Sequence, residues 1–373
     1  MTVAAATTPD ESASPPIVVV STTRGGGWGG RTSLLELAEG LGRLGRDVSL
    51  LTVEPEMADA WRSATGRTAR VMKVPRARGA AVGRNSKARR FMAAMAVASQ
   101  IAKIPRQATV IVFDHDALCA SAMVALAKPW ARRRVFLDVH FPAHRWRARA
   151  RAWGRHLTGA ICVSAFSAEP FEGICPTHVV WRPITDVIAP RSVDNGQLVS
   201  VALLGRVDRV KHPDMGVRAV AELADPDVRL IMRGAGYMDS DDYLASVCSL
   251  GENLLGDQFA FEGRVPRERT LDDVDVLLHC NPHEAFGRTV AESQVAGRIV
   301  VVPDEGGSAE FVRDGLTGFK YDFTSASSLQ AALRKAVDAA RVDPEIGRRA
   351  REFALAEFDA VALSRRYLEV LES

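Results

Sequence analysis

Two carboxylates near a predicted helix start give the sharpest chemical signal in this sequence. Glu284 lies in a loop after a predicted strand, and Glu292 lies on the helix that follows, within NPHEAFGRTVAESQVAG. A loop carboxylate can hold sugar hydroxyls, and a carboxylate two turns along a helix can accept both hydroxyls of a ribose. Between them, the N–H groups of a helix N-terminus would suit phosphate oxygens. The residues at this predicted N-terminus are Phe286, Gly287, Arg288 and Thr289.

Two cations precede another predicted helix, in LLGRVDRVKHPDMGV. Arg206 follows a predicted strand over 199–204, and Lys211 lies five residues later. Two cations beside a helix N-terminus can clamp a diphosphate, because the helix end adds partial positive charge. Loop arginines and lysines are often merely solvated, so this pattern alone leaves that alternative open.

Further polar groups follow two strands of the first half. His140 ends FLDVH, and Asp114, His115 and Asp116 lie in FDHDAL. We expect His140 either to contact a substrate or to satisfy a local hydrogen bond at the strand end. The Asp-His-Asp group is expected to face an acceptor, to cap a helix or, in a metal-dependent enzyme, to hold a divalent cation.

A glycine-rich stretch lies between the first predicted strand and the first predicted helix. STTRGGGWGG fits the G-x-G-x-x-G phosphate fingerprint at Gly25, Gly27 and Gly30, and Glu54 ends the next predicted strand. This combination is typical of a dinucleotide-binding dehydrogenase. Five of the six residues 25–30 are glycine, so the match is partly automatic and a loop that closes on a phosphate remains an alternative.

The elements that must position these residues alternate between strands and helices. Short runs rich in Val and Ile followed by helical patterns predict an α/β protein with parallel sheets. A break at 181–197, rich in Pro, Asn and Gly, separates two doubly wound domains. Ligands on such sheets bind beyond the carboxyl ends of the strands, so a cleft between the domains is expected. Strands are expected at about 17–22, 48–53, 109–113, 134–139, 159–163, 199–204, 228–233, 258–261, 275–280 and 299–302.

In this order the motifs resemble the retaining GT-B glycosyltransferases, in their large E-x7-E, glycosyltransferase family 4-like and glycogen-synthase-related group. The resemblance covers most of 17–373 and includes the later turn GGSAEFV. It implies two Rossmann-like domains that face each other across a cleft, and a C-terminal helix that crosses back to the first domain. The expected division is a disordered tail at 1–16, an acceptor-binding domain at 17–187, a nucleotide-sugar-binding domain at 188–356 and the crossing helix at 357–373.

The resemblance also implies roles for single residues. Arg206 and Lys211 would neutralise the donor diphosphate. Glu284 would contact the transferred sugar and Glu292 the ribose, while His140 would lie beside the reacting sugar. The remaining residues implied on the donor side are Gly27, Gly29 and Gly30 in the closing loop, Gly234, Arg264 and Val265 around the base, and the backbone at Phe286, Gly287, Arg288 and Thr289; Trp28 and Asp116 would face the acceptor.

Two features depart from the family pattern. His212 follows the lysine where the family usually has Gly, and NPHE, which ends at Glu284, is shorter than the common PSxxE. The sugar pocket is therefore expected to differ from that of relatives.

The implied enzyme is a retaining hexosyltransferase that moves a sugar from a nucleoside-diphosphate sugar, with UDP-sugar favoured, to an acceptor hydroxyl. Side-chain cations would stabilise the leaving diphosphate during front-face transfer, so no cofactor and no essential metal are expected. The main alternative is a sugar-nucleotide epimerase on the same fold, followed by an NAD-dependent dehydrogenase. A metal-dependent single-domain transferase and a non-catalytic partner subunit are further alternatives.

Charge is distributed unevenly along the chain. Residues 1–187 hold 26 Lys and Arg against 14 Asp and Glu, a charge of +12, whereas the rest carries −9. A basic first half suits a phosphorylated or lipid-linked acceptor at the inner membrane face, an anionic glycan, or a small natural-product acceptor for which the charge is incidental. Nucleic acid is not an expected partner.

Composition bounds the setting of the protein. Five scattered cysteines and the absence of a signal-peptide pattern predict a cytoplasmic protein, with peripheral membrane contact an open possibility. No apolar run reaches the length of a transmembrane helix. The Ala- and Arg-rich composition is typical of high-GC bacteria and is compatible with secondary metabolism.

Overall fold

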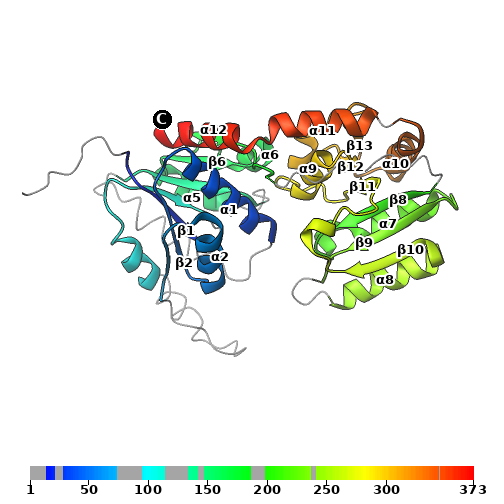
Figure 1. Ribbon diagram of the computed structural model, residues 1–373, viewed down its shortest axis with the longest axis horizontal. Helices are drawn as coiled ribbons and strands as arrows, with labels where there is room; N and C mark the ends of the chain where they lie inside the picture. Colours follow the sequence, from blue (N-terminus) through cyan, green and yellow to red (C-terminus); the bar gives the residue numbers. More distant parts are fainter. Residues whose placement is uncertain are drawn as a thin grey trace, which may run out of the picture.

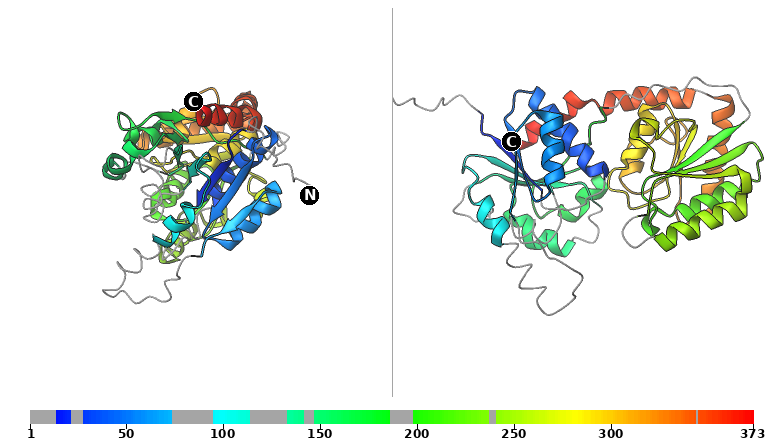
Figure 2. Two further views of the ribbon diagram at one scale, coloured as in Figure 1. Left: turned by 90° about the vertical axis from the view of Figure 1, so that its left-hand side faces the viewer. Right: turned by 60° about the horizontal axis from the view of Figure 1, so that its bottom comes forward.

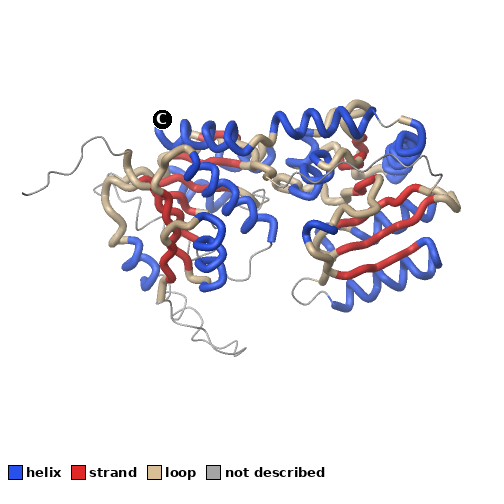
Figure 3. Tube along the Cα trace, in the orientation of Figure 1, coloured by secondary structure: helices blue, strands red, loops and turns tan. Residues whose placement is uncertain are grey.

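Two parallel sheets with helices on their faces make up the molecule (Figures 1 and 3). The computed structural model describes residues 14–21, 28–73, 95–113, 133–141, 147–185, 198–236, 241–343 and 345–373. The first sheet has the strand order β3-β2-β1-β4-β5-β6-β7. Its strands are β1 (Ile17–Ser21), β2 (Val48–Thr52), β3 (Ala69–Val71), β4 (Thr109–Val112), β5 (Val135–Val139), β6 (Gly159–Cys162) and β7 (Thr177–Val179).

The second sheet repeats this design in the C-terminal half. Its order is β10-β9-β8-β11-β12-β13, again parallel throughout. Its strands are β8 (Val199–Leu204), β9 (Val228–Arg233), β10 (Phe259–Gly263), β11 (Val276–Leu278), β12 (Ile299–Pro303) and β13 (Phe319–Tyr321).

Helices cover both faces of each sheet. In the first half, α1 (Trp28–Arg43) and α2 (Pro55–Thr65) pack on one face, and α5 (Arg147–Trp153) and α6 (Ala165–Ala168) on the other. In the second half one face carries α7 (Pro213–Glu222), α8 (Asp241–Leu255) and α10 (Ala326–Val342). The other carries α9 (Arg288–Val295) and α11 (Glu345–Glu357). Among the helices that the structure describes, none is both long and apolar enough to span a membrane.

The sequence explains why these strands lie in the middle of layers. In β1, Ile17 and Val19 pack against the face of α1 and α2, whereas Val18 and Val20 pack against the opposite face. A strand buried on both faces must be apolar at every position, and this is why the strands read as continuous Val and Ile runs. All ten expected strands are present, within a few residues of the expected bounds. The α/β fold class is therefore confirmed.

Three strands escaped prediction from the sequence. They are β3, β7 and β13, which are each three residues long and each form an edge of their sheet. Such short segments have too few residues for a periodic pattern, and they become strands because a neighbouring strand offers free hydrogen-bonding groups.

The last helix, α12 (Ala360–Glu372), leaves the C-terminal half and packs on α1 of the first (Figures 1 and 2). Leu363, Tyr367 and Leu371 lie in the same core as the α1 residues Leu34 and Leu41. The expected crossing of the C-terminal helix is thus confirmed. Within the predicted break, the described residues 182–184 are buried, and Arg182 is only 1% exposed.

The close approach of α12 to α1 requires a glycine. A Cβ at Gly40 would lie 1.9 Å from Ser364 Oγ and 2.9 Å from Ser364 Cβ. Alanine in a free helix position stabilises relative to glycine by about 0.5 to 1 kcal/mol. We predict that Gly40→Ala instead lowers the free energy of unfolding by about 1 to 3 kcal/mol, because it overpacks this contact.

Urea unfolding measures this change, and hydrogen exchange of α12 amides locates it. Glu39→Ala on the same helix is the control, since the Glu39 side chain is 39% exposed. A Gly40→Ala protein as stable as wild type, with equally protected α12 amides, would show that the helices do not meet as described.

Candidate functional site

The carboxyl ends of the C-terminal strands meet at a set of glycines. Gly205 follows β8 with φ 120°, and Gly234 follows β9 with φ 152°. A Cβ at Gly234 would lie 1.7 Å from the Gly205 carbonyl oxygen, so no other residue fits there. The N–H of Gly234 donates to the carbonyl of Gly263 at 2.8 Å. Three adjacent strand ends are thus held together directly before Arg206 and Arg264.

Glu284 is the centre of a polar cluster at this edge. It forms an ion pair with Lys211, and its Oε2 accepts a hydrogen bond from Asn281 Nδ2 at 2.9 Å. His279 Nε2 lies 3.8 Å from the same oxygen. Burial alone would raise the pKa of Glu284, but the charges of Lys211 and His279 and the hydrogen bonds from Lys211 and Asn281 together outweigh this and lower that pKa to about 2. Glu284 is therefore an anion that touches the cation assigned to the diphosphate.

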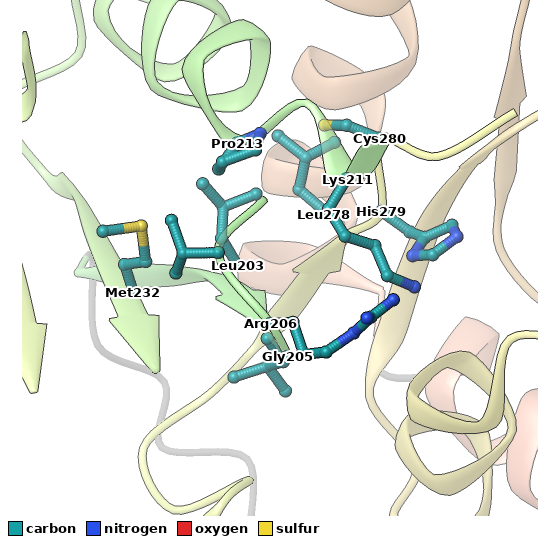
Figure 4. A pocket seen from close by; sticks show the side chains of 11 residues that line it. Leu203, Gly205, Arg206, Lys211, Pro213, Met232, Leu278, His279 and Cys280 are labelled. Atoms are coloured by element: carbon teal, nitrogen blue, oxygen red, sulfur yellow. The ribbon is translucent and has the colours of Figure 1, made fainter. Parts of the chain in front are cut away.

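The two predicted cations point toward a shared space. Arg206 and Lys211 extend toward the same region of a pocket that Gly205, His279 and Cys280 also line (Figure 4). One further residue supports both. Asp208 Oδ1 accepts from the N–H of Lys211 at 3.2 Å, and Asp208 Oδ2 lies 3.5 Å from Arg206 Nη2.

The GGSAEFV turn supports the loop that carries Glu284. The N–H of Gly307 donates to the carbonyl of Glu284 at 2.7 Å. A Cβ at Gly306 would lie 2.5 Å from the carbonyl oxygen of Pro282, and one at Gly307 would lie 2.0 Å from that of Ala285. The two glycines let the turn pack directly against this loop and so help to position Glu284.

Helix α9 begins where the sequence predicts. Gly287 precedes it with φ 85°, and no side chain caps this end. The first N–H groups of a helix have no partner within it, so those at Arg288 and Thr289 could donate to an anion. The Phe286 side chain itself is buried against Phe311 and Phe358, so only its backbone can face a ligand.

Glu292 lies in a network that reaches across to the first half. Arg288 Nε and Arg267 Nη2 contact Glu292 Oε1 at 2.8 and 3.0 Å. The Arg288 guanidinium also donates two hydrogen bonds to Glu36 of α1, at 2.6 and 2.7 Å, and one to Ser33 at 3.1 Å. Arg288 is thus shared between the expected ribose-binding carboxylate and a carboxylate of the other half.

His140 lies at the carboxyl end of β5. Its Nδ1 is 3.3 Å from Asp138 Oδ1, and its ring stacks on Phe113 with centroids 4.0 Å apart. A Cβ at Gly30 would lie 3.3 Å from the Cδ2 and 3.5 Å from the Nε2 of His140. The Nε2 edge of the ring therefore faces the first turn of α1.

The first turn of α1 lies close to predicted residues of both halves. Gly30 lies against His140, and a Cβ at the neighbouring Gly29 would lie 3.9 Å from Arg288 Cδ. A Cβ at Gly287 would in turn lie 3.5 Å from Glu284 Cγ. The N-termini of α1 and α9 therefore lie between His140 and Glu284.

One detail of the glycine stretch differs from expectation. Gly29 and Gly30 were expected in a loop, but they lie in the first turn of α1, which begins at Trp28. The helix therefore starts inside the glycine fingerprint, where the lack of side chains admits the His140 ring.

His212, which stands where the family usually has glycine, adopts a backbone conformation that suits glycine. It has φ 46° and ψ 46°, a left-handed backbone that glycine adopts most readily, and its ring lies 5.1 Å from that of Phe323. The backbone after Lys211 is therefore the one that a glycine would favour. Several expected residues lie outside the described part of the chain: Gly25, Gly27, Asp114, His115 and Asp116, together with the side chain of Trp28.

The structure adds site residues that the sequence analysis missed. Asp208, Asn281 and His279 surround the Lys211–Glu284 pair, and Glu36 and Arg267 complete the network around Arg288. Asn281 and His279 had a visible signal, since they directly follow β11. Glu36 had none, because it lies on a helix far away in the sequence. Within the described residues, no group of three His, Cys, Asp or Glu is arranged to hold a metal ion.

Comparison with the sequences of known proteins gives matches for part of the chain. Residues 190–353 match the family model for Glycosyl transferases group 1. D-inositol 3-phosphate glycosyltransferase from Mycobacterium ulcerans is 36% identical over 127 residues, which are 32% of this chain and 26% of that protein. The Nocardia farcinica protein of the same name is 32% identical over 129 residues, 32% of this chain and 28% of that protein. The chain thus aligns with only about a quarter of the length of these relatives.

Solved structures match nearly the whole chain. Anabaena Alr3699/HepE, in complex with UDP and glucose, has a TM-score of 0.76 and 18% identity, covering 96% of this chain and 100% of that one. Sucrose-phosphate synthase from Thermosynechococcus elongatus has a TM-score of 0.75 and 17% identity, with 96% and 98% covered. At this identity the likeness establishes the fold, and the expected two-sheet GT-B architecture is confirmed.

His279 gives the cluster a predictable pH dependence. Burial, opposed by the charge of Glu284, lowers the pKa of His279 from 6.5 to about 4. Between these values the unfolded chain binds the proton and the folded protein does not, so the contribution of His279 to stability is present above pH 6.5 and is lost toward pH 4. We predict that the stability of wild type relative to His279→Asn decreases as pH falls from 7 to 4.5.

Urea unfolding of both proteins at the two pH values measures this difference. Asparagine does not titrate, so the variant reports every other pH-dependent group. An unchanged difference between the two proteins would show that His279 titrates alike in the folded and unfolded states.

Proposed function

We propose that this chain, which has the GT-B fold and whose residues 190–353 match the group 1 glycosyltransferases, transfers a sugar from a nucleoside-diphosphate sugar to an acceptor hydroxyl. One observation carries the proposal. Two cations, an anionic loop carboxylate and an uncapped helix N-terminus lie together at the carboxyl edge of the C-terminal sheet. This combination matches the charges of a sugar diphosphate, with cations and N–H groups for phosphates and a carboxylate for sugar hydroxyls.

The Lys211–Glu284 pair suggests how the donor is received. Without substrate, Lys211 is neutralised by Glu284. An entering diphosphate would take over the ammonium group as its partner, together with Arg206 and the N–H groups of Arg288 and Thr289. Glu284 would then be free to accept hydrogen bonds from sugar hydroxyls. The site exchanges one charge pair for another, which keeps the cost of burying the diphosphate low.

We propose transfer with retention of anomeric configuration. The bond between the anomeric carbon and the diphosphate oxygen breaks, and the acceptor oxygen bonds to that carbon from the same face. The acceptor proton passes to the departing phosphate oxygen. Arg206 and Lys211 stabilise the charge that develops on the diphosphate, and this role supports a reaction without an essential metal. His140 would lie beside the reacting sugar.

Glu292 remains the proposed ribose ligand. Both arginines contact its Oε1, so its Oε2 is the oxygen that a ribose hydroxyl would reach. The two arginines would hold the carboxylate in one rotamer. Arg264 and Val265, which follow β10 beside Gly234, would surround the base through their backbone.

The donor and acceptor are proposed as classes. A UDP-sugar is favoured because Alr3699/HepE, which shares the fold, was solved with UDP, with UDP and glucose, and with UDP-glucose. The acceptor is proposed to be a small natural product or a lipid-linked molecule. The excess of Lys and Arg in residues 1–187 supports contact with an anionic acceptor or membrane surface. A cytoplasmic location and a role in secondary metabolism are part of the same proposal.

Substitution of Glu292 should affect nucleotide binding, and substitution of Glu284 should affect sugar transfer. Glu292→Gln should weaken binding of the nucleoside diphosphate by about 10-fold, since a hydrogen bond to a charged group is lost. Glu284→Gln should leave that affinity within about 3-fold and lower sugar transfer by about 100-fold or more. Calorimetric titration with UDP, GDP, ADP and TDP measures binding, and release of the diphosphate from the matching nucleotide glucose measures turnover.

Asp225→Asn is the matched control for these variants. Asp225 also pairs with an arginine, Arg341, through two hydrogen bonds, but it precedes β9 at the amino edge of the sheet. It should bind and turn over like wild type. Undiminished binding and turnover in both glutamate variants would contradict the proposed site, and a changed sugar nucleotide formed without an acceptor would favour the epimerase.

A further inference from the structure

A buried polar network lies beneath His140. Asp138 is fully buried and accepts hydrogen bonds from Arg182 Nη2 and from Tyr367 Oη, the latter at 2.8 Å. His140 Nδ1 lies 3.3 Å from Asp138 Oδ1, the oxygen that also accepts from Arg182. Three side chains from different parts of the sequence thus converge on the carboxylate that contacts the His140 ring.

The network sets which nitrogen of His140 carries a proton. Burial alone would raise the pKa of Asp138, but the charge of Arg182 and the contact with His140 outweigh this and hold that pKa below its ordinary value. An ionised carboxylate only accepts hydrogen bonds, so His140 must donate through Nδ1. In the neutral ring Nε2 then carries the lone pair, and this is the edge that faces Gly30 and the first turn of α1.

Burying this network costs free energy that its contacts only partly recover. Arg182 and Asp138 lose their hydration, and in the described part of the chain Arg182 Nε and Nη1 are buried without a hydrogen-bond partner. A buried ion pair with unsatisfied donors stabilises less than apolar side chains of similar volume. The arrangement is better explained by what it does to the third group that contacts Asp138, which is His140.

Tyr367 ties this network to the other half of the molecule. It lies on α12, and its ring packs beside the Arg182 guanidinium, 5.7 Å from centroid to Cζ. Helix α12 continues from α11, which packs on α9. Helix α12 is thus joined, through α11, to the helix that carries Arg288 and Glu292.

We propose that Asp138, Arg182 and Tyr367 are positioning residues that hold His140 with Nε2 directed at the reacting sugar, and that the crossing C-terminal helix takes part in the site through Tyr367. The proposal rests on the function proposed above. It predicts that loss of the Tyr367 hydroxyl acts through His140 and not through stability.

Tyr367→Phe is the direct test, because it removes one hydroxyl and keeps the ring beside Arg182. We expect kcat for sugar transfer to fall roughly 10-fold, the size expected for a lost hydrogen bond to a charged group, while KM for the donor stays within about 2-fold. In a His140→Ala background the same change should have no further effect on kcat, because the group through which it acts is gone. Equal losses of kcat in both backgrounds would overturn the proposal.

Tyr243→Phe is the matched control. Tyr243 also donates to a carboxylate, Asp214, and Arg209 lies over its ring with its Cζ 4.6 Å from the centroid. The chemistry of the two tyrosines is therefore the same, but Tyr243 lies on α8 in the C-terminal half. Its hydroxyl should be dispensable for kcat.

A measurement without substrate separates this proposal from the proposed function. Histidine labelled with nitrogen-15 distinguishes the two neutral tautomers by NMR, and the His140→Ala spectrum assigns the His140 signals. We expect the Nδ1–H tautomer in wild type and in Tyr243→Phe, and a smaller Nδ1–H fraction in Asp138→Asn, where the charge that favours this tautomer is gone. An Nε2–H tautomer in wild type, or an Nδ1–H fraction as high in Asp138→Asn as in wild type, would overturn the positioning role. Absent sugar transfer with the expected tautomers would instead count against the proposed function alone.

Discussion

The contact between Arg288 and Glu36 is the interaction on which the site depends. Each sheet has its own core, and neither half alone assembles His140, the start of α1 and the start of α9. Arg288 donates to Glu36 in one half and to Glu292 in the other. Two opposing carboxylates held by one guanidinium fix the distance between the two helix starts, because the planar donors of arginine permit few geometries.

Charge balance explains the arrangement around this contact. Every carboxylate of the site has a cation beside it: Lys211 for Glu284, Arg288 and Arg267 for Glu292, and Arg182 for Asp138. A buried carboxylate without such a partner would take up a proton and lose its ability to accept hydrogen bonds. The cations beside Glu284 and Asp138 thus help to keep these two carboxylates charged. In the proposed reaction an incoming diphosphate would meet cations already held in place by their partners.

Patterns local in the sequence predicted most of the fold and half of the site. Val and Ile runs predicted ten strands, and polar residues in the segments after strands provided Arg206, Lys211, Glu284 and His140 as candidates. Contacts between segments far apart in the sequence were not accessible in this way. Glu36 meets Arg288 across 252 positions and Tyr367 meets Asp138 across 229, and nothing in either local pattern names the partner. Such pairs depend on the packing of α1, α9 and α12.

Thermal unfolding with UDP, GDP, ADP, TDP or NAD, each with and without EDTA, shows whether the polar cluster around Lys211 and Glu284 binds a nucleoside diphosphate through side-chain cations. A ligand at 100 times its dissociation constant adds about 2.7 kcal/mol of stability, which raises the melting temperature by a few degrees. We expect one nucleoside diphosphate to stabilise the protein equally with and without EDTA. Stabilisation by NAD alone, or by a nucleotide only when a divalent metal is present, would contradict it.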